Sequence, residues 1–231
     1  MNNNILEINT NKIQKISLAI NDTHNEGIPI LSSLEIASSN SVEEFYKTNY
    51  PEYKIIKFGN YTFIKIGKLI TFYFDKKNNY IPKFSIGPHW YLTLLLLLII
   101  LSLAMLLYYS IFKRLSIAKK IIFVLFVLSV YFFALKTALV NPKIVMNKKK
   151  TATEYGYCSF CKCYYNPYEK VEHCDDCRVC FEKMDHHCIW MGKCVAKNNT
   201  RSFYGMLIDI GIFYAYIIYC TIVMAKNKKK L

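Results

Sequence analysis

An uncharged stretch in the middle of the chain restricts the folds that this sequence can adopt. From Phe84 to Phe112 no Asp, Glu, Lys or Arg occurs, and the core of the run reads YLTLLLLLIILSLAMLLYYSIF. A helix rises about 1.5 Å per residue, so a helix of this length crosses the roughly 30 Å hydrocarbon core of a bilayer. Soluble helices rarely run this far without a charge, because one face must meet water. We therefore predict a transmembrane helix over residues 91–112.

Two further apolar runs predict two more membrane-spanning helices. They cover residues 117–140 and 203–225, and the short connection after the first predicted helix makes the first two helices a hairpin. Residues 1–49 are rich in Asn and Ser, and we expect them to be poorly ordered or peripheral. Residues 50–90 are dense in β-branched and aromatic residues, which is typical of short strands or of an interfacial segment. Residues 226–231 form a basic tail.

Positive charge dominates the chain. The net charge is +14, from 30 basic and 16 acidic residues. Such an excess suits nucleic acid, anionic lipid or an acidic ligand. Because the chain also carries membrane spans, we expect the lipid bilayer and a phosphorylated ligand as partners, and no nucleic acid.

A cluster of cysteine and histidine lies between the second and third predicted spans. Eight of the nine cysteines fall within the sequence CSFCKCYYNPYEKVEHCDDCRVCFEKMDHHCIWMGKC, from Cys158 to Cys194. Cysteine pairs with two residues between them suit tetrahedral zinc, whose bonds to sulfur are about 2.3 Å long. The mixture with histidine favours metal over disulfides, and so a reducing compartment. The ligands suffice for two zinc ions, and we expect residues 141–202 to form a loop-rich domain that folds only with zinc.

The segment Asp185–Cys188 reads Asp-His-His-Cys. Such a tetrad, inside a Cys-rich domain between two transmembrane helices, resembles the DHHC protein S-acyltransferases. The spacing within His173–Cys180 and within Cys194–Phe203 resembles that family as well, and the resemblance covers residues 59–206. It implies an α-helical integral membrane protein with a two-zinc Cys-rich domain between the second and third helices. This chain presents three predicted spans where the family norm is four, and it lacks the family's Thr-Thr-x-Glu motif.

The resemblance implies two structural zinc sites, each closed by four protein ligands. One set is implied at Cys158, Cys161, His173 and Cys180. The other set is implied at Cys174, Cys177, His187 and Cys194. Cys163 remains an alternative ligand in the first set, because the interval from Cys161 to His173 is longer than the family's spacing.

The resemblance also assigns the chemistry to Cys188. Its thiolate is expected to attack the thioester of acyl-CoA, the co-substrate, and to pass the acyl group to a client protein with a membrane-proximal cysteine. A thiolate is a strong nucleophile when a neighbour lowers its pKa; His186 is the expected base, and Asp185 orients it. The implied activity is that of a protein-cysteine S-palmitoyltransferase. The alternative is an inactive, membrane-anchored zinc module that binds partners.

Basic residues flank the Cys-rich domain. Lys193 and Arg201 bracket Cys194 and are expected to bind the phosphates of acyl-CoA, whereas Lys148–Lys150 are expected to attract anionic lipid. The family places its Cys-rich domain in the cytosol. The resemblance therefore implies an ER or Golgi membrane protein whose zinc domain faces the cytosol.

Overall fold

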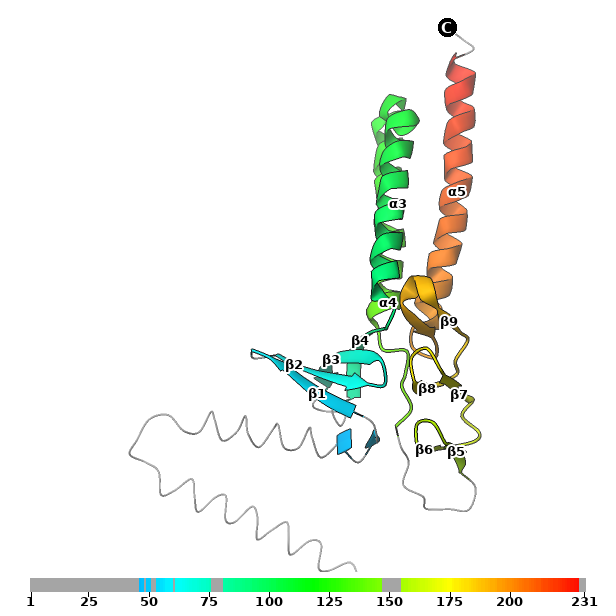
Figure 1. Ribbon diagram of the computed structural model, residues 1–231. Helices are drawn as coiled ribbons and strands as arrows, with labels where there is room; N and C mark the ends of the chain where they lie inside the picture. The colour runs from blue at the N-terminus through cyan, green and yellow to red at the C-terminus, as the bar shows by residue number, and fades with distance from the viewer. Residues whose placement is uncertain are drawn as a thin grey trace, which may run out of the picture. The chain divides into compact units, whose positions relative to one another are not determined.

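A computed structural model shows how the predicted segments are arranged (Figure 1). The structure describes residues 46–47, 49–50, 53–59, 61–75, 81–146 and 155–228. All of these described residues belong to one compact unit. The expectations for residues 1–45 and for Lys148–Lys150 fall on residues outside the described part.

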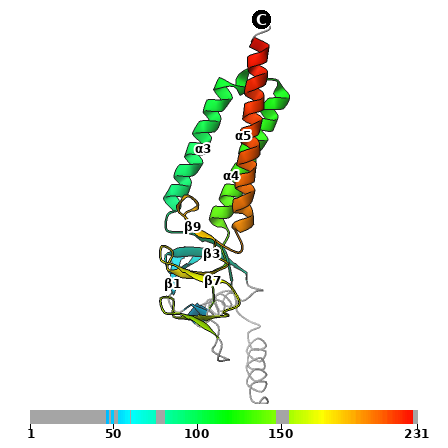
Figure 2. The same ribbon diagram turned by 90° about the vertical axis from the view of Figure 1, so that its right-hand side faces the viewer.

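Three long helices are sufficiently long and apolar to cross a membrane, which confirms the prediction of three spans. They are α3 (Trp90–Ser110), α4 (Ile117–Leu139) and α5 (Thr200–Lys228), with mean hydropathy of 2.6, 2.3 and 2.0. They run side by side in both views (Figures 1 and 2). Most of their apolar side chains are exposed, which in water would be costly and in lipid is favourable.

The helices pack through aromatic rings and one glycine. A single turn of 3-10 helix, Phe112–Arg114, follows α3 and precedes α4. Phe112 is fully buried, with its ring 4.3 Å from the Phe123 ring and 5.8 Å from the Tyr216 ring of α5. Gly205 of α5 lies against the Phe133 ring of α4, where an added Cβ would come within 3.0 Å. The small residue therefore allows α4 and α5 to approach closely.

An antiparallel four-stranded meander precedes α3. Its strands, in sheet order, are β1 (Tyr53–Phe58), β2 (Tyr61–Ile66), β3 (Leu69–Asp75) and β4 (Ile81–Ile86). Side chains on one face of the sheet are buried, and they include Ile64, Ile66, Leu69, Thr71 and Ser85. These strands lie within the segment expected to be β-rich or interfacial.

Three two-stranded hairpins build the Cys-rich domain. The pairs are β5 (Gly156–Cys158) with β6 (Cys163–Tyr165), β7 (Val171–Cys174) with β8 (Val179–Glu182), and β9 (His186–Cys188) with β10 (Lys193–Val195). A turn of 3-10 helix, Ile189–Met191, connects the last pair. Hairpins this short bury little apolar surface, so a bound metal would supply much of the stability.

Polar contacts fasten the Cys-rich domain to the sheet and to the ends of the membrane helices. The Lys68 backbone N–H donates to the Cys177 carbonyl (2.8 Å). The Asn199 side chain donates to the Thr137 carbonyl at the end of α4 (3.2 Å) and to the Cys194 carbonyl (3.1 Å). These bonds hold the Cys-rich domain, with the hairpin of β9 and β10, at the ends of the membrane helices.

Candidate metal centres and nucleophile

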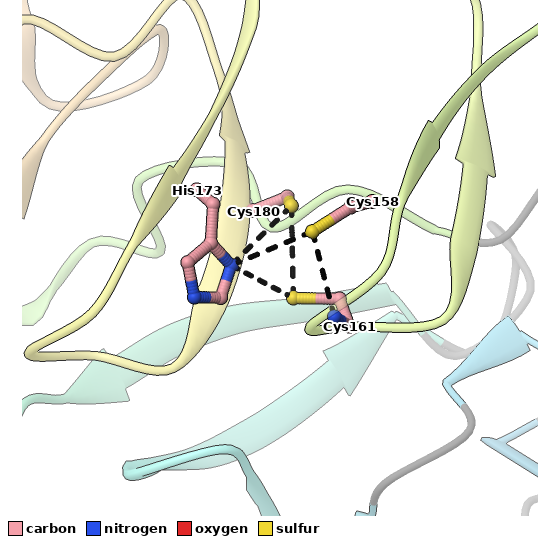
Figure 3. Close-up of side chains that lie close together, drawn as sticks. All are labelled: Cys158, Cys161, His173 and Cys180. Atoms are coloured by element: carbon pink, nitrogen blue, oxygen red, sulfur yellow. Dashed lines mark hydrogen bonds between the residues drawn. The ribbon is translucent and has the colours of Figure 1, made fainter.

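The first ligand set meets between the first two hairpins (Figure 3). Nδ1 of His173 lies 3.1 Å from the sulfur of Cys161 and 3.7 Å from the sulfurs of Cys158 and Cys180. All four ligand atoms lie within 4.8 Å of one another. The set is the one that the family resemblance implies. Cys163 is buried beside it, opposite Cys158 in the β5–β6 pairing, but does not belong to the four.

The second ligand set joins the second and third hairpins. Nδ1 of His187 lies 3.4 to 3.5 Å from the sulfurs of Cys174, Cys177 and Cys194. These four ligand atoms also lie within 4.8 Å of one another. His173 and Cys174 are neighbours on β7 but serve different sets, because successive strand side chains point to opposite faces. β7 therefore links the two centres.

The geometry of both sets fits zinc. Tetrahedral zinc with bonds of about 2.3 Å to sulfur requires sulfurs about 3.8 Å apart. The sulfurs of Cys177 and Cys194 are 3.7 Å apart, and those of Cys161 and Cys180 are 3.6 Å apart. Hydrogen bonds from neighbouring thiols lower the pKa of Cys174, whose thiolate in turn raises the pKa of Cys177 to about 12. Full ionisation of such a set therefore requires a cation.

Both histidine ligands are oriented by a second contact. Nε2 of His173 lies 3.5 Å from the Asp175 carboxylate. Nε2 of His187 lies 3.1 Å from Nδ1 of His89, the residue directly before α3. When Nδ1 binds metal, the other ring nitrogen, Nε2, carries the proton, and the Asp175 carboxylate and Nδ1 of His89 are placed to accept it. No motif in the sequence indicates a role for His89; its one signal is a histidine directly before the first span.

The side chains of His186, His187 and Cys188 point alternately to the two faces of β9. His187 points to the second ligand set, so the alternation of side chains places His186 and Cys188 together on the other face. Nδ1 of His186 lies 3.7 Å from the Asp185 carboxylate, which also accepts a hydrogen bond from the Tyr204 hydroxyl (3.0 Å). The structure thus joins Asp185 and His186. The contact with Tyr204 was not predicted from the sequence.

Cys188 lies at the boundary between the Cys-rich domain and the helices. It is partly buried against a cluster that contains Ala134, Met191 and Met206. Met191 and Leu97 of this environment also line an apolar cavity of about 470 Å³ between α3, α4 and the sheet. An apolar space of this kind suits a hydrocarbon chain.

The structure contradicts the prediction that Lys193 binds the phosphates of acyl-CoA. Its side chain is fully buried, and Nζ donates to the Ser85 carbonyl (2.6 Å), the Ser85 hydroxyl (3.0 Å) and the Val140 carbonyl (2.8 Å). Burial lowers the pKa of its ammonium group. An ammonium group has three donors, and all three are used here. Lys193 therefore has no donor left for an acyl-CoA phosphate.

Arg201 lies beside a polar hollow of about 770 Å³ next to Asp185. The hollow is lined mainly by basic and polar residues: Lys170, Lys183, Met184, Asp185, Lys197, Asn198, Thr200 and Arg201. Lys197 forms an ion pair with Glu182, which raises the pKa of Lys197. Within the part of the chain that the structure describes, Lys183 and Arg201 form no ion pair.

Comparisons with known proteins agree with this site. Residues 151–230 match the model of the DHHC palmitoyltransferase family. Palmitoyltransferase ZDHHC18 of Homo sapiens is 38% identical over 87 residues, which cover 38% of this chain and 20% of that protein. Palmitoyltransferase ZDHHC18-A of Danio rerio is 36% identical over 87 residues, covering 38% of this chain and 16% of that protein. Palmitoyltransferase ZDHHC9 of Mus musculus is 35% identical over 94 residues, which cover 41% of this chain and 23% of that protein. The match thus spans less than a quarter of each relative's length.

Proposed function

We propose, from the match of residues 151–230 to the DHHC palmitoyltransferase family, that this chain transfers a long-chain acyl group from acyl-CoA to cysteines of client proteins. The observation that carries the proposal is the position of Cys188. It stands outside both four-ligand sets, on the strand face of His186, and it packs against the cluster of Met191, a residue that also lines the apolar cavity between α3, α4 and the sheet. Of the two other cysteines outside these sets, Cys163 lies against the first set and Cys220 lies within α5.

The first step forms an acyl-enzyme. His186, held by the Asp185 carboxylate, accepts the proton of the Cys188 thiol. The thiolate attacks the thioester carbonyl, the bond from Cys188 sulfur to the acyl carbon forms, and the bond from that carbon to the CoA sulfur breaks. His186 then returns its proton to the departing CoA thiolate. The two ligand sets would hold two zinc ions, whose role would be structural: bound there, they would fix β9 and so the relative positions of His186 and Cys188.

The second step passes the acyl group to the client. A cysteine thiol of the client gives its proton to His186 and attacks the thioester carbonyl at Cys188. The new thioester forms on the client, the bond at Cys188 breaks, and Cys188 regains the proton. Because Cys188 borders the membrane helices, clients with membrane-proximal cysteines fit this site best. A reducing compartment preserves zinc-bound thiolates, so we place the Cys-rich domain on the cytosolic side of an ER or Golgi membrane.

A transfer assay tests this function. The purified chain in lipid nanodiscs is mixed with palmitoyl-CoA and a membrane-anchored peptide that carries one cysteine beside its anchor. We expect acylated peptide with the wild-type chain and none with Cys188→Ser, while a peptide with serine in that position stays unmodified. Equal transfer by wild type and Cys188→Ser would refute the proposal.

The basic hollow is the proposed binding site for the CoA phosphates. It adjoins Asp185, and Lys183 and Arg201 offer cationic groups that pair with no acidic residue among those described. We expect the double variant Lys183→Gln with Arg201→Gln to need roughly tenfold more acyl-CoA for half-maximal acylation, the effect of losing about 1.4 kcal/mol of binding. Lys113→Gln with Arg114→Gln removes the same charge at the opposite end of the helices and serves as the control. An equal shift in both double variants would exclude a specific phosphate site.

A further inference from the structure

The four-stranded sheet has two faces of different character. Its buried face contacts the Cys-rich domain at two places. At the β2–β3 turn, Gly67 lies so close to Arg178 that an added Cβ would come 2.5 Å from the Arg178 carbonyl oxygen. On β4, Ser85 accepts hydrogen bonds from the Lys193 ammonium group. The register places the opposite side chains together on a second face. We call this second face the outer face, and it carries Lys54, Ile56, Phe58, Tyr61, Phe63, Lys65, Ile70, Phe72, Phe84 and Ile86.

Apart from Lys54 and Lys65, the outer face is apolar, and its edge beside the β1–β2 turn is exposed. Phe58 and Tyr61 stand directly opposite each other beside the β1–β2 turn, and their side chains are 77% and 72% exposed. A row of three aromatic rings continues this surface across the sheet. The ring centroids of Phe63 and Phe72 are 6.3 Å apart, and those of Phe72 and Phe84 are 5.8 Å apart. An aromatic surface of this kind left in water is costly, and in proteins it marks a binding surface.

Two lysines on the outer face indicate that its binding partner is negatively charged. Lys54 and Lys65 are paired directly across β1 and β2, on the outer face, and both are exposed. Like charges opposite each other on a sheet repel. Neither forms an ion pair with a described residue, so an anionic surface beside them would relieve the repulsion.

The outer face is continuous with the membrane-facing part of the molecule. Ile70 and Ile86 line the same apolar cavity as Trp90, Thr93 and Leu94 of α3. Only three residues separate the end of β4 from the start of α3, and Phe84 pairs with Val140 at the end of α4. Figure 1 shows the sheet beside the ends of α3 and α4. The sheet is therefore fixed at the boundary where the spans leave the bilayer.

We infer that the outer face of the sheet lies on an anionic lipid surface, with Phe58 and Tyr61 inserted among the headgroups and Lys54 and Lys65 beside the lipid phosphates. Aromatic side chains favour this interfacial region, and lysines there are attracted to anionic lipid. The contact holds the sheet, and through it the Cys-rich domain, at a fixed depth. The inference does not rest on acyl transfer.

Photo-crosslinking tests the contact. Benzoylphenylalanine replaces Phe58 or Tyr61 in the full chain, which is placed in nanodiscs of phosphatidylcholine with phosphatidylserine and irradiated. Tyr168, 86% exposed in the Cys-rich domain, takes the same replacement as the matched control. We expect lipid adducts by mass spectrometry at positions 58 and 61, at least several-fold above those at position 168. Equal yields at all three positions, or crosslinks between two copies of the chain at 58 and 61, would overturn the inference.

The charge component is tested in the same material. Lys54→Gln with Lys65→Gln should lower the adduct yield at position 58 several-fold in the mixed lipid and leave it unchanged in pure phosphatidylcholine. Lys113→Gln with Arg114→Gln is the control and should change neither yield. A yield at position 58 that is the same with and without phosphatidylserine would contradict the anionic surface.

Discussion

Adjacent residues in this protein often serve different purposes, because short strands alternate their side chains between two faces. On β9, His187 joins a metal set while His186 and Cys188 turn to the other face. On β10, Cys194 joins the same metal set while Lys193 points into the interface with the sheet. Two hairpin strands thus connect the metal, the nucleophile and the anchoring lysine.

Lys193 is expected to be a structural anchor. Lys193→Met keeps the length of the side chain but leaves the Ser85 and Val140 carbonyls without their donor, at about 1–3 kcal/mol for each buried acceptor. We expect the unfolding temperature of the zinc-loaded protein to fall by several degrees. Lys197→Met, which removes an exposed ion pair with Glu182, should change it little. Equal unfolding temperatures for Lys193→Met and wild type would show that these bonds contribute nothing.

The ligand sets could be predicted from the sequence, and their surroundings could not. Cysteine and histidine at zinc spacing, together with a family resemblance, are sufficient to indicate all eight ligands. His89 and Tyr204 were missed because their contacts join segments that are separated in sequence: His89 and His187 are 98 residues apart. The burial of Lys193 was missed for the same reason, since a lysine beside a membrane span ordinarily faces water or lipid headgroups.

Among the elements, the turn between β2 and β3 joins the sheet to the Cys-rich domain. Gly67 has φ +56°, and an added Cβ would come 2.5 Å from the Arg178 carbonyl and 2.7 Å from the Cys177 carbonyl. The adjacent Lys68 backbone N–H donates to that Cys177 carbonyl. The sheet therefore touches the turn that carries two ligands of the second metal set.

Two matched substitutions isolate this contact. Gly59 has φ +54°, close to that of Gly67, but an added Cβ there meets nothing within 4 Å. Gly59→Ala should cost about 1 kcal/mol of stability from backbone strain alone. Gly67→Ala should cost more, because the turn must also move away from the carbonyls, and it should speed zinc release to a chelator. Similar zinc release rates in the two variants would show that the turn does not support the metal site.

The elements differ in how far sequence patterns define them. A long uncharged run can satisfy its backbone in lipid only as a helix, so the spans follow directly from composition. The segment before α3 mixes lysine with aromatic and β-branched residues at both strand faces. That pattern fits a strand or an interfacial segment, and only the strand register shows which side chains share a face.

At the scale of the whole molecule, the membrane helices, the sheet and the Cys-rich domain converge on Cys188. α4 and α5 provide its apolar neighbours, and the metal sets fix its strand, β9. His89 contacts His187 of β9 at the start of the membrane hairpin, and Lys193 of the paired strand β10 bonds to Val140 at its end. This arrangement places a free thiol at the membrane boundary, where an acyl chain and a thioester can be held together. The central claim is that this thiol accepts the acyl group.

Intact mass spectrometry of the purified chain after exposure to palmitoyl-CoA tests that claim most directly. We expect wild type to gain one acyl group, removable by hydroxylamine and located on Cys188 by peptide mapping. Cys188→Ser should gain none and still retain two zinc ions under native conditions, while the control Cys163→Ser should be acylated like wild type. A hydroxylamine-sensitive acyl group retained by Cys188→Ser would contradict the claim.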